Sequence, residues 1–206
     1  MSYLNKDYNS VKIVLLGDDN VGKTSLCYKI TKNIFREKID STIGIDFFNK
    51  DIYYHGKKFK LIIWDTSGQK RYRCVLKNYY KFAQLYIIVF DLSNMESFNS
   101  IDFWIKEIEE NSNLSEYNIL LIGNKNDLNK VVSDDLIKEK IKIYNLDFIK
   151  ISLKDSYNLY NLENKIYKKI ENKSKYVNEN SKLIEKDNLK LNLHTEKKFE
   201  CCCTII

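Results

Sequence analysis

The octapeptide GDDNVGKT, residues 17–24, fits the pattern G-x-x-x-x-G-K-[ST] of a phosphate-binding loop. It follows the apolar run VKIVLL at residues 11–16 and precedes a stretch with helical character. Its two glycines let the backbone turn without a Cβ clash, so that successive N–H groups form an anion nest at a helix start. Lys23 can then reach the β- and γ-phosphates of a nucleotide, and the Thr24 hydroxyl can bind Mg²⁺. Strand, loop and helix in this order predict a nucleotide site.

Short apolar runs alternate with helical patterns along the rest of the chain. The runs at residues 85–90 and 119–122 are almost wholly apolar, as in strands that helices cover on both faces. A further short strand is expected at residues 148–151. Apolar residues recur at helical spacing over 98–108, 136–141 and 159–170, with Ser133 as a candidate N-cap. This alternation predicts a doubly wound α/β domain, and a hairpin is expected near residues 46–65 with Gly56 at its turn.

Length, composition and charge exclude several classes of protein. With 206 residues and 44% hydrophobic residues, the chain can bury the core of one domain and is not wholly disordered. A net charge of +6 without a dense basic stripe argues against nucleic-acid binding. The polar start predicts no secretory signal, and no apolar run is long enough to cross a bilayer. We expect a reduced, cytosolic domain over residues 9–172 and a flexible tail over residues 173–206.

A second motif, NKND at residues 124–127, follows the apolar run at the edge where ligands bind in open α/β sheets. A carboxylate at Asp127 can accept from both N1–H and the exocyclic amine of guanine. Adenine has no such pair of donors and would leave the carboxylate unpaired. Asn124 can bond to the base and join this segment to the phosphate loop, and the Lys125 stem can lie over the base plane. Together with the phosphate loop, this motif indicates guanine rather than adenine.

With both motifs in place, the chain resembles the Rab branch of the Ras-like small GTPases over about residues 9–172 and at its extreme C-terminus. The elements that carry the resemblance, in the family's order, are GDDNVGKT at 17–24, STIGIDF at 41–47, WDTSGQ at 64–69, NKND at 124–127 and ISLK at 151–154. The resemblance implies a P-loop NTPase of the small-GTPase fold. Its mostly parallel six-stranded sheet is expected to be flanked by about five helices.

The resemblance also implies a role for individual residues in binding GTP or GDP. The expected nucleotide contacts are Asp19, Asn20, Val21, Gly22, Lys23, Thr24, Ser25, Phe35, Thr42, Gly68, Asn124, Lys125, Asp127, Ser152, Leu153 and Lys154. Thr24 and Thr42 would bind Mg²⁺ directly, and Asp65 would hold it through water. Gln69 would be the catalytic residue, because it orients the water that converts GTP to GDP and phosphate. Leu153 replaces the family's usual Ala, but the contact is expected from its backbone N–H.

Several positions depart from the family pattern. Asp19 and Asn20 stand where smaller residues are usual, Ser67 replaces Ala, Lys70 replaces Glu, and Ile39 replaces a frequent aromatic. A carboxylate at Asp19 would face the γ-phosphate and the path of an arginine finger. We therefore expect slow intrinsic hydrolysis that depends on an activating protein. The alternative is a GTP-binding scaffold with little or no hydrolysis, whereas a nucleotide kinase would need a lid for which the sequence offers no candidate.

The resemblance further implies two switch segments, at about residues 35–47 (switch I) and 66–80 (switch II), which GTP orders and hydrolysis releases. Phe47, Trp64 and Tyr79 are then candidates for a surface that recruits effectors. Equally, these three aromatic residues could belong to the core.

The chain ends in CCCTII, residues 201–206, where three adjacent cysteines suit neither one metal ion nor a disulfide framework. Prenylation fits, with two geranylgeranyl chains on Cys202 and Cys203, or one on Cys203 as a C-a-a-X signal. By the resemblance, the partners are an exchange factor, an activating protein, a GDP-dissociation inhibitor, an escort protein with geranylgeranyltransferase, and effectors. A monomer is expected to cycle between the cytosol and the cytoplasmic face of an intracellular membrane in vesicle trafficking. A Ras-like signalling GTPase remains the near alternative.

Overall fold

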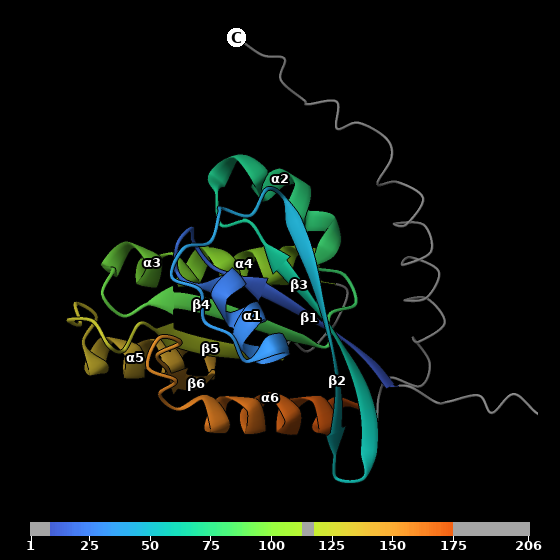
Figure 1. Ribbon diagram of the computed structural model, residues 1–206. Coiled ribbons are helices and arrows are strands. Elements are labelled where there is room, and N and C mark those ends of the chain that lie inside the picture. The colour runs from blue at the N-terminus through green and yellow to red at the C-terminus, as the bar shows by residue number, and fades with distance from the viewer. Residues whose placement is uncertain (1–8, 113–117, 175–206) are drawn as a thin grey trace, which may run out of the picture.

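The computed structural model describes residues 9–112 and 118–174, and these form a twisted sheet with helices on both faces (Figure 1). The predictions for residues 175–206, including the expected prenylation of Cys202 and Cys203, lie outside the described residues. In the described part of the chain, six strands make one sheet in the order β2-β3-β1-β4-β5-β6. Their bounds are β1 Asn9–Leu16, β2 Ile45–Tyr54, β3 Lys57–Thr66, β4 Leu85–Asp91, β5 Ile119–Asn124 and β6 Asp147–Lys150. All neighbouring pairs are parallel except β2–β3, so the predicted mostly parallel sheet is confirmed.

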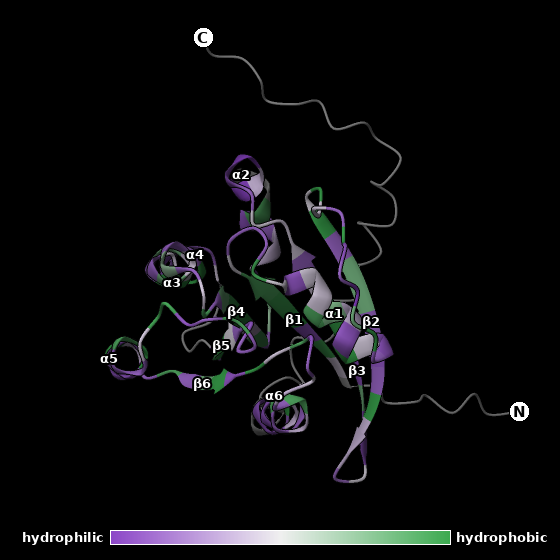
Figure 2. Cartoon of the chain, turned by 60° about the vertical axis from the view of Figure 1, so that its left-hand side comes forward, coloured by the Kyte–Doolittle hydropathy of each residue, from purple (hydrophilic) through white to green (hydrophobic). Residues whose placement is uncertain are grey.

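The strand β1 shows why helices are needed on both faces. Its side chains alternate, so that Ile13 and Leu15 belong to one apolar cluster while Val14 and Leu16 belong to another. The first cluster is completed by α1 and α6, and the second by α3, α4 and α5. Figure 2 shows the hydrophobic colour concentrated on this central strand, as burial on both faces requires.

Among the α-helices of residues 9–112 and 118–174, four have ten residues or more and two are short. The long helices are α1 Lys23–Lys32, α4 Ile101–Asn111, α5 Asp134–Tyr144 and α6 Leu159–Ser174, and the short ones are α2 Arg73–Leu76 and α3 Met95–Asn99. Ser133 caps α5 as expected, because its Oγ accepts from Leu136 N–H at 3.4 Å. The helical pattern at 98–108 divides into α3 and α4 at Ser100. Within the described residues, no helix is long and apolar enough to cross a membrane.

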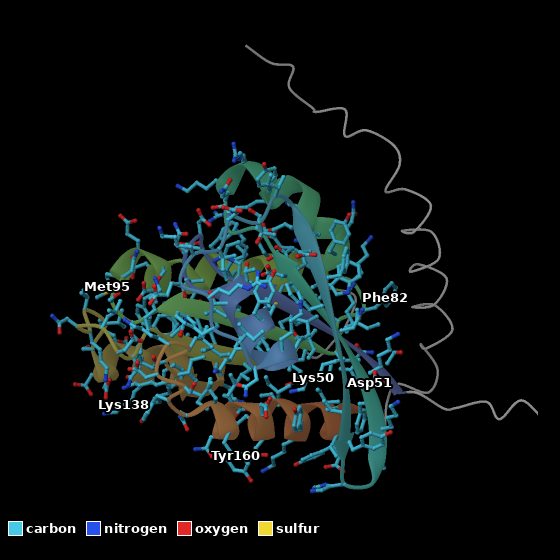
Figure 3. The ribbon with its side chains drawn as sticks, in the orientation of Figure 1. Lys50, Asp51, Phe82, Met95, Lys138 and Tyr160 are labelled. Carbon is cyan, nitrogen blue, oxygen red and sulfur yellow. The ribbon has the colours of Figure 1, made fainter. Side chains whose placement is uncertain are left out.

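The predicted hairpin is confirmed as β2 and β3, and it turns at Gly56, whose φ is +74°. The hairpin extends beyond the sheet toward α6. Lys50 on β2, labelled in Figure 3, pairs with Glu163 of α6 at 2.9 Å. Nearer the turn, His55 Nδ1 lies 3.0 Å from Glu171. These contacts join the antiparallel edge of the sheet to the helix that ends the described chain.

Strands β3, β1, β4, β5 and β6 all run in one direction, so their carboxyl ends meet at one edge of the sheet. The phosphate loop follows β1, the WDTSGQ segment spans the end of β3, and NKND spans the end of β5. Motifs far apart in the sequence are thereby gathered at the edge where open α/β sheets bind ligands.

Candidate nucleotide site

A cavity of about 480 Å³ lies at this edge of the sheet. That volume suits a small-molecule ligand such as a nucleotide. The predicted contacts that line it are Asp19, Asn20, Gly22, Lys23, Thr24, Ser25, Phe35, Thr42, Gly68, Asn124, Lys125, Asp127, Leu153 and Lys154. The predicted site residues Val21, Asp65, Gln69 and Ser152 do not line it. Further residues line the cavity that were not among the predicted nucleotide contacts: Arg36, Glu37, Ile39, Asp40, Ser41, Thr66 and Leu128.

Two glycines of the phosphate loop occupy places that only glycine fits. Gly17 has φ +140°, and a Cβ there would come closer than 3.0 Å to the carbonyl of Val89. Gly22 has φ +101°, and a Cβ there would collide with the side-chain amide of Asn124. That amide donates to the carbonyl of Val21 at 2.9 Å. The base motif is therefore fastened directly to the phosphate loop, which places the two halves of the site at a set distance.

Lys23 is a buried cation at the start of α1. Its Nζ donates to the carbonyls of Gly17 at 2.9 Å and of Asp18 at 2.7 Å. Burial lowers the pKa of Lys23 to about 8, and the nearby carboxylates of Asp65 and Asp19 oppose this shift. An anion in the cavity would favour the charged form of this lysine, so the loop is built to receive a negative group.

Three oxygen-bearing side chains meet beside the phosphate loop. Thr24 Oγ1 donates to Asp65 Oδ2 at 2.6 Å, and Thr42 Oγ1 lies 2.9 Å from Thr24 Oγ1. Asp65 is fully buried, and among the described residues its Oδ1 has no hydrogen-bond partner. Burial raises the pKa of Asp65, whereas the hydrogen bond from Thr24 and the charge of Lys23 lower it. An unsatisfied carboxylate oxygen beside two hydroxyls fits the oxygen ligands that Mg²⁺ prefers.

The base end of the cavity holds an oriented carboxylate. Ser152 Oγ donates to Asp127 Oδ1 at 2.6 Å, so a buried serine outside the cavity positions an exposed aspartate that lines it. Asn124 Oδ1 is buried and has no partner within the described part of the chain. Leu153 packs into the core with 2% of its surface exposed, which explains how it replaces a smaller residue. Lys125 Nζ pairs with Asp91 at 2.8 Å.

The switch segments are joined to each other and to the phosphate loop. Ser67 N–H donates to the carbonyl of Gly44 at 2.8 Å, which links switch II to switch I. A Cβ at Gly68 would come closer than 3.0 Å to backbone atoms of Asp18 and Asp19. Switch II therefore lies directly against the phosphate loop in this structure.

Gln69 lies outside the main cavity. Its Oε1 accepts from Arg71 Nε at 2.9 Å, and its backbone N–H donates to Ser67 Oγ at 3.3 Å. The Gln69 side chain lines a neighbouring hollow of about 590 Å³ between switch II and α3. A catalytic role for Gln69 would require its side chain to leave Arg71 and turn toward the nucleotide.

The three aromatic residues divide between surface and core. Phe47 is 46% exposed, whereas Trp64 is only 4% exposed. Their ring centroids lie 4.7 Å apart, and those of Trp64 and Tyr79 lie 5.2 Å apart. Lys12 Nζ also contacts this tryptophan and lies 3.9 Å from the Trp64 ring centroid. Trp64 therefore belongs to the core, whereas Phe47 and partly buried Tyr79 pack on it from the surface.

The fold and this cavity define a phosphate-loop nucleotide-binding protein, and comparisons with known proteins name the family. The Ras family model matches residues 12–172. The "GTP-binding protein ypt1" of Schizosaccharomyces pombe is 38% identical over 159 residues, 76% of this chain and 78% of the relative. "Ras-related protein Rab-11A" of Dictyostelium discoideum is 40% identical over 150 residues, 72% of this chain and 70% of the relative. Human "Ras-related protein Rab-8B" is 41% identical over 151 residues, 72% of each chain. The chain belongs to the Ras family, as a Rab-type small GTPase.

Proposed function

We propose that this protein is a GTP-binding and GTP-hydrolysing switch that alternates between a GTP form and a GDP form. One observation carries the proposal: the phosphate loop, the oriented carboxylate of Asp127 and the hydroxyl-bearing Thr24 and Thr42 line a single cavity, and the Asp65 carboxylate accepts from Thr24 beside it. The printed name of the yeast relative, a GTP-binding protein, supports the same conclusion.

The reaction converts GTP and water to GDP and phosphate. Lys23 and the backbone N–H groups of residues 17–24 hold the phosphates, and Asp127 selects guanine. Mg²⁺, when bound by Thr24 and Thr42 with Asp65 beside it, would neutralise charge on the β- and γ-phosphates. Gln69 orients the attacking water after its side chain leaves Arg71. In the closed arrangement, Gly68 of switch II and Thr42 of switch I both lie against the phosphate loop, as they do in this structure. Because the chemistry is mostly positioning and charge stabilisation, this closed arrangement is the active one.

A competition experiment tests nucleotide specificity. Purified protein, stripped of nucleotide and supplied with Mg²⁺, is titrated with a fluorescent GDP analogue, which is then displaced by GDP or ADP. We expect GDP to compete at least about 100-fold better than ADP, because adenine leaves the Asp127 carboxylate without its two donors. Equal competition by GDP and ADP would refute the proposed function.

A second prediction concerns the effect of Asp19 on the rate of GTP hydrolysis. This carboxylate is exposed at the cavity wall, and its backbone lies against Gly68. A like charge about 4 Å from the γ-phosphate opposes the transition state by about 1 kcal/mol at the dielectric of bulk water, which suits an exposed carboxylate. We expect Asp19→Ser to raise the single-turnover rate of GTP hydrolysis about fivefold.

The matched control is Asp135→Ser, which removes an exposed carboxylate on α5, away from the cavity. Equal rates for the wild type and Asp19→Ser, with and without an activating protein, would contradict the prediction. If the wild type showed no turnover at all, the alternative of a GTP-binding scaffold would be favoured.

We further propose that the switch acts in vesicle trafficking on an intracellular membrane. Support comes from the cysteines at the C-terminus and from the Rab names of the relatives. Two geranylgeranyl chains on Cys202 and Cys203 would anchor the protein more firmly than one. Exchange factor, activating protein, dissociation inhibitor, escort protein and effectors are the partners such a cycle requires.

The mass of the C-terminal peptide from native protein tests the anchor. We expect the mass of two prenyl groups, and a single group would refute the double modification. Localisation of a tagged copy with its tail intact separates the trafficking role from that of a Ras-like signalling protein at the cell surface.

A further inference from the structure

Arg73, the first residue of α2 in switch II, lies between the phosphate loop and α4. Its Nη2 donates to Asp18 Oδ1 at 3.2 Å. The Arg73 guanidinium carbon lies 4.2 Å from the ring centroid of Phe103 and 4.8 Å from that of Trp104, both on α4. Trp104 Nε1 donates to the same Asp18 oxygen at 3.1 Å. One carboxylate oxygen of the phosphate loop is therefore shared by switch II and α4.

The same interface leaves three buried polar atoms unsatisfied. Among the described residues, Arg73 Nε, Glu107 Oε2 and Tyr80 OH have no hydrogen-bond partner. The other oxygen of Glu107, Oε1, lies 4.0 Å from Nζ of the half-exposed Lys77. Burial raises the pKa of Tyr80, and the negative charge of Glu107 acts in the same direction. Buried polar atoms without partners are costly, so an arrangement that satisfies them is favoured if the chain can reach it.

Such an arrangement is one helical turn away. Glu107 follows Phe103 by four residues on α4, and side chains at this spacing lie on the same face of a helix, about 5–6 Å apart at their Cβ atoms. The Arg73 guanidinium already lies over Phe103. A guanidinium offers five N–H donors in a planar fork, which suits it to either carboxylate.

The pairing of Arg73 with Asp18 belongs to the closed arrangement. In this structure Gly68 lies against the backbone of Asp18, and Thr42 Oγ1 is 2.9 Å from Thr24 Oγ1 of the phosphate loop. Both switch segments thus lie close to the phosphate loop. If switch II moves away, Arg73 is carried from Asp18 while Glu107 keeps its place on α4.

We propose that Arg73 exchanges partners between the two nucleotide states, binding Asp18 in the GTP form and Glu107 in the GDP form. The inference rests on the proposed function as a GTP–GDP switch. Glu107 competes with Asp18 for one cation, so the Glu107 charge lowers the preference of the protein for GTP over GDP. Removing the Glu107 charge shifts the equilibrium toward the closed form. A GTP analogue, which prefers the closed form, then binds more tightly.

A two-residue cycle tests the exchange. The affinities for GDP and for a non-hydrolysable GTP analogue are measured for the wild type, Glu107→Gln, Arg73→Gln and the double variant. We expect Glu107→Gln to raise the ratio of analogue affinity to GDP affinity about three- to tenfold, and to leave it unchanged in the Arg73→Gln background. Glu109→Gln, which removes an exposed carboxylate from the same helix, is the control and should not alter the ratio.

A spectroscopic measurement gives a second readout that does not depend on affinity. The chain has two tryptophans, so Trp64→Phe assigns the Trp104 indole N–H resonance in a ¹H–¹⁵N spectrum. We expect this resonance to differ between the GDP form and the analogue form of the wild type, because Trp104 Nε1 no longer shares its Asp18 acceptor oxygen with Arg73 once Arg73 leaves.

The possible results distinguish failure of the Arg73 exchange from failure of the proposed GTP–GDP switch. If the wild type binds both nucleotides but Glu107→Gln has no effect, or has an equal effect with and without Arg73, the exchange is refuted while the switch stands. An unchanged Trp104 resonance in the two forms refutes it as well. If the wild type binds neither nucleotide, both proposals fail.

Discussion

Asp127→Asn should lower the affinity for GDP about 10²- to 10⁴-fold and leave the weak affinity for ADP almost unchanged. In the proposed recognition, the carboxylate would accept two hydrogen bonds from guanine, and each bond to a charged group contributes about 1.5–3 kcal/mol. An amide at this position presents at most one acceptor and adds a donor that faces the donors of the base. The variant therefore loses discrimination between the bases rather than affinity for phosphate.

Titration of the wild type and the variant with both nucleotides measures this change. Ser152→Ala provides a graded companion, because it removes the hydroxyl that donates to Asp127 at 2.6 Å without altering the carboxylate. We expect it to weaken GDP binding about tenfold, the effect of one lost hydrogen bond to a charged group. Asp135→Asn is the exposed control. A parallel fall in GDP and ADP affinity for Asp127→Asn would contradict base recognition and point to a general loss of folding.

Gly68→Ala should lower the affinity for a GTP analogue at least about tenfold while the affinity for GDP changes less than about threefold. A Cβ at position 68 would come closer than 3.0 Å to backbone atoms of Asp18 and Asp19. Those atoms belong to the phosphate loop and cannot turn away as the end of a flexible side chain can. The methyl group therefore excludes the arrangement in which switch II lies against the phosphate loop. By the proposed function, the GTP form would require this arrangement and the GDP form would not.

Gly56→Ala is the matched control for this substitution. A Cβ there meets no atom within 4 Å, although its φ of +74° makes the substitution cost about 1–2 kcal/mol of stability. We expect lower thermal stability for Gly56→Ala with an unchanged ratio of analogue affinity to GDP affinity. If Gly68→Ala weakens both nucleotides equally, the contact of switch II with the phosphate loop serves the whole site and not the GTP form.

Much of the fold could be predicted because strands and helices leave local patterns. The apolar runs at residues 85–90 and 119–122 became β4 and β5, and Gly56 lies at the turn of the hairpin. The single helical pattern at 98–108 became two helices that divide at Ser100. The first of them begins before the pattern, where Asn94 caps α3 by accepting from Ser97 N–H at 3.1 Å. Hydrophobic periodicity does not show where one helix ends and the next begins in the same stripe.

The sequence by itself determined the phosphate loop and the base motif, because their chemistry follows from residue type at fixed spacing. It also predicted that Asp19 is the acidic residue of the phosphate loop that affects GTP hydrolysis. Only the tertiary structure showed that its neighbour Asp18 holds Arg73 and Trp104, partners 55 and 86 positions away. It also showed that Gln69 rests on Arg71 and that Ser152 orients Asp127. The physical reason is that spacing along a chain governs local geometry, whereas the partners of a side chain depend on how separate elements pack.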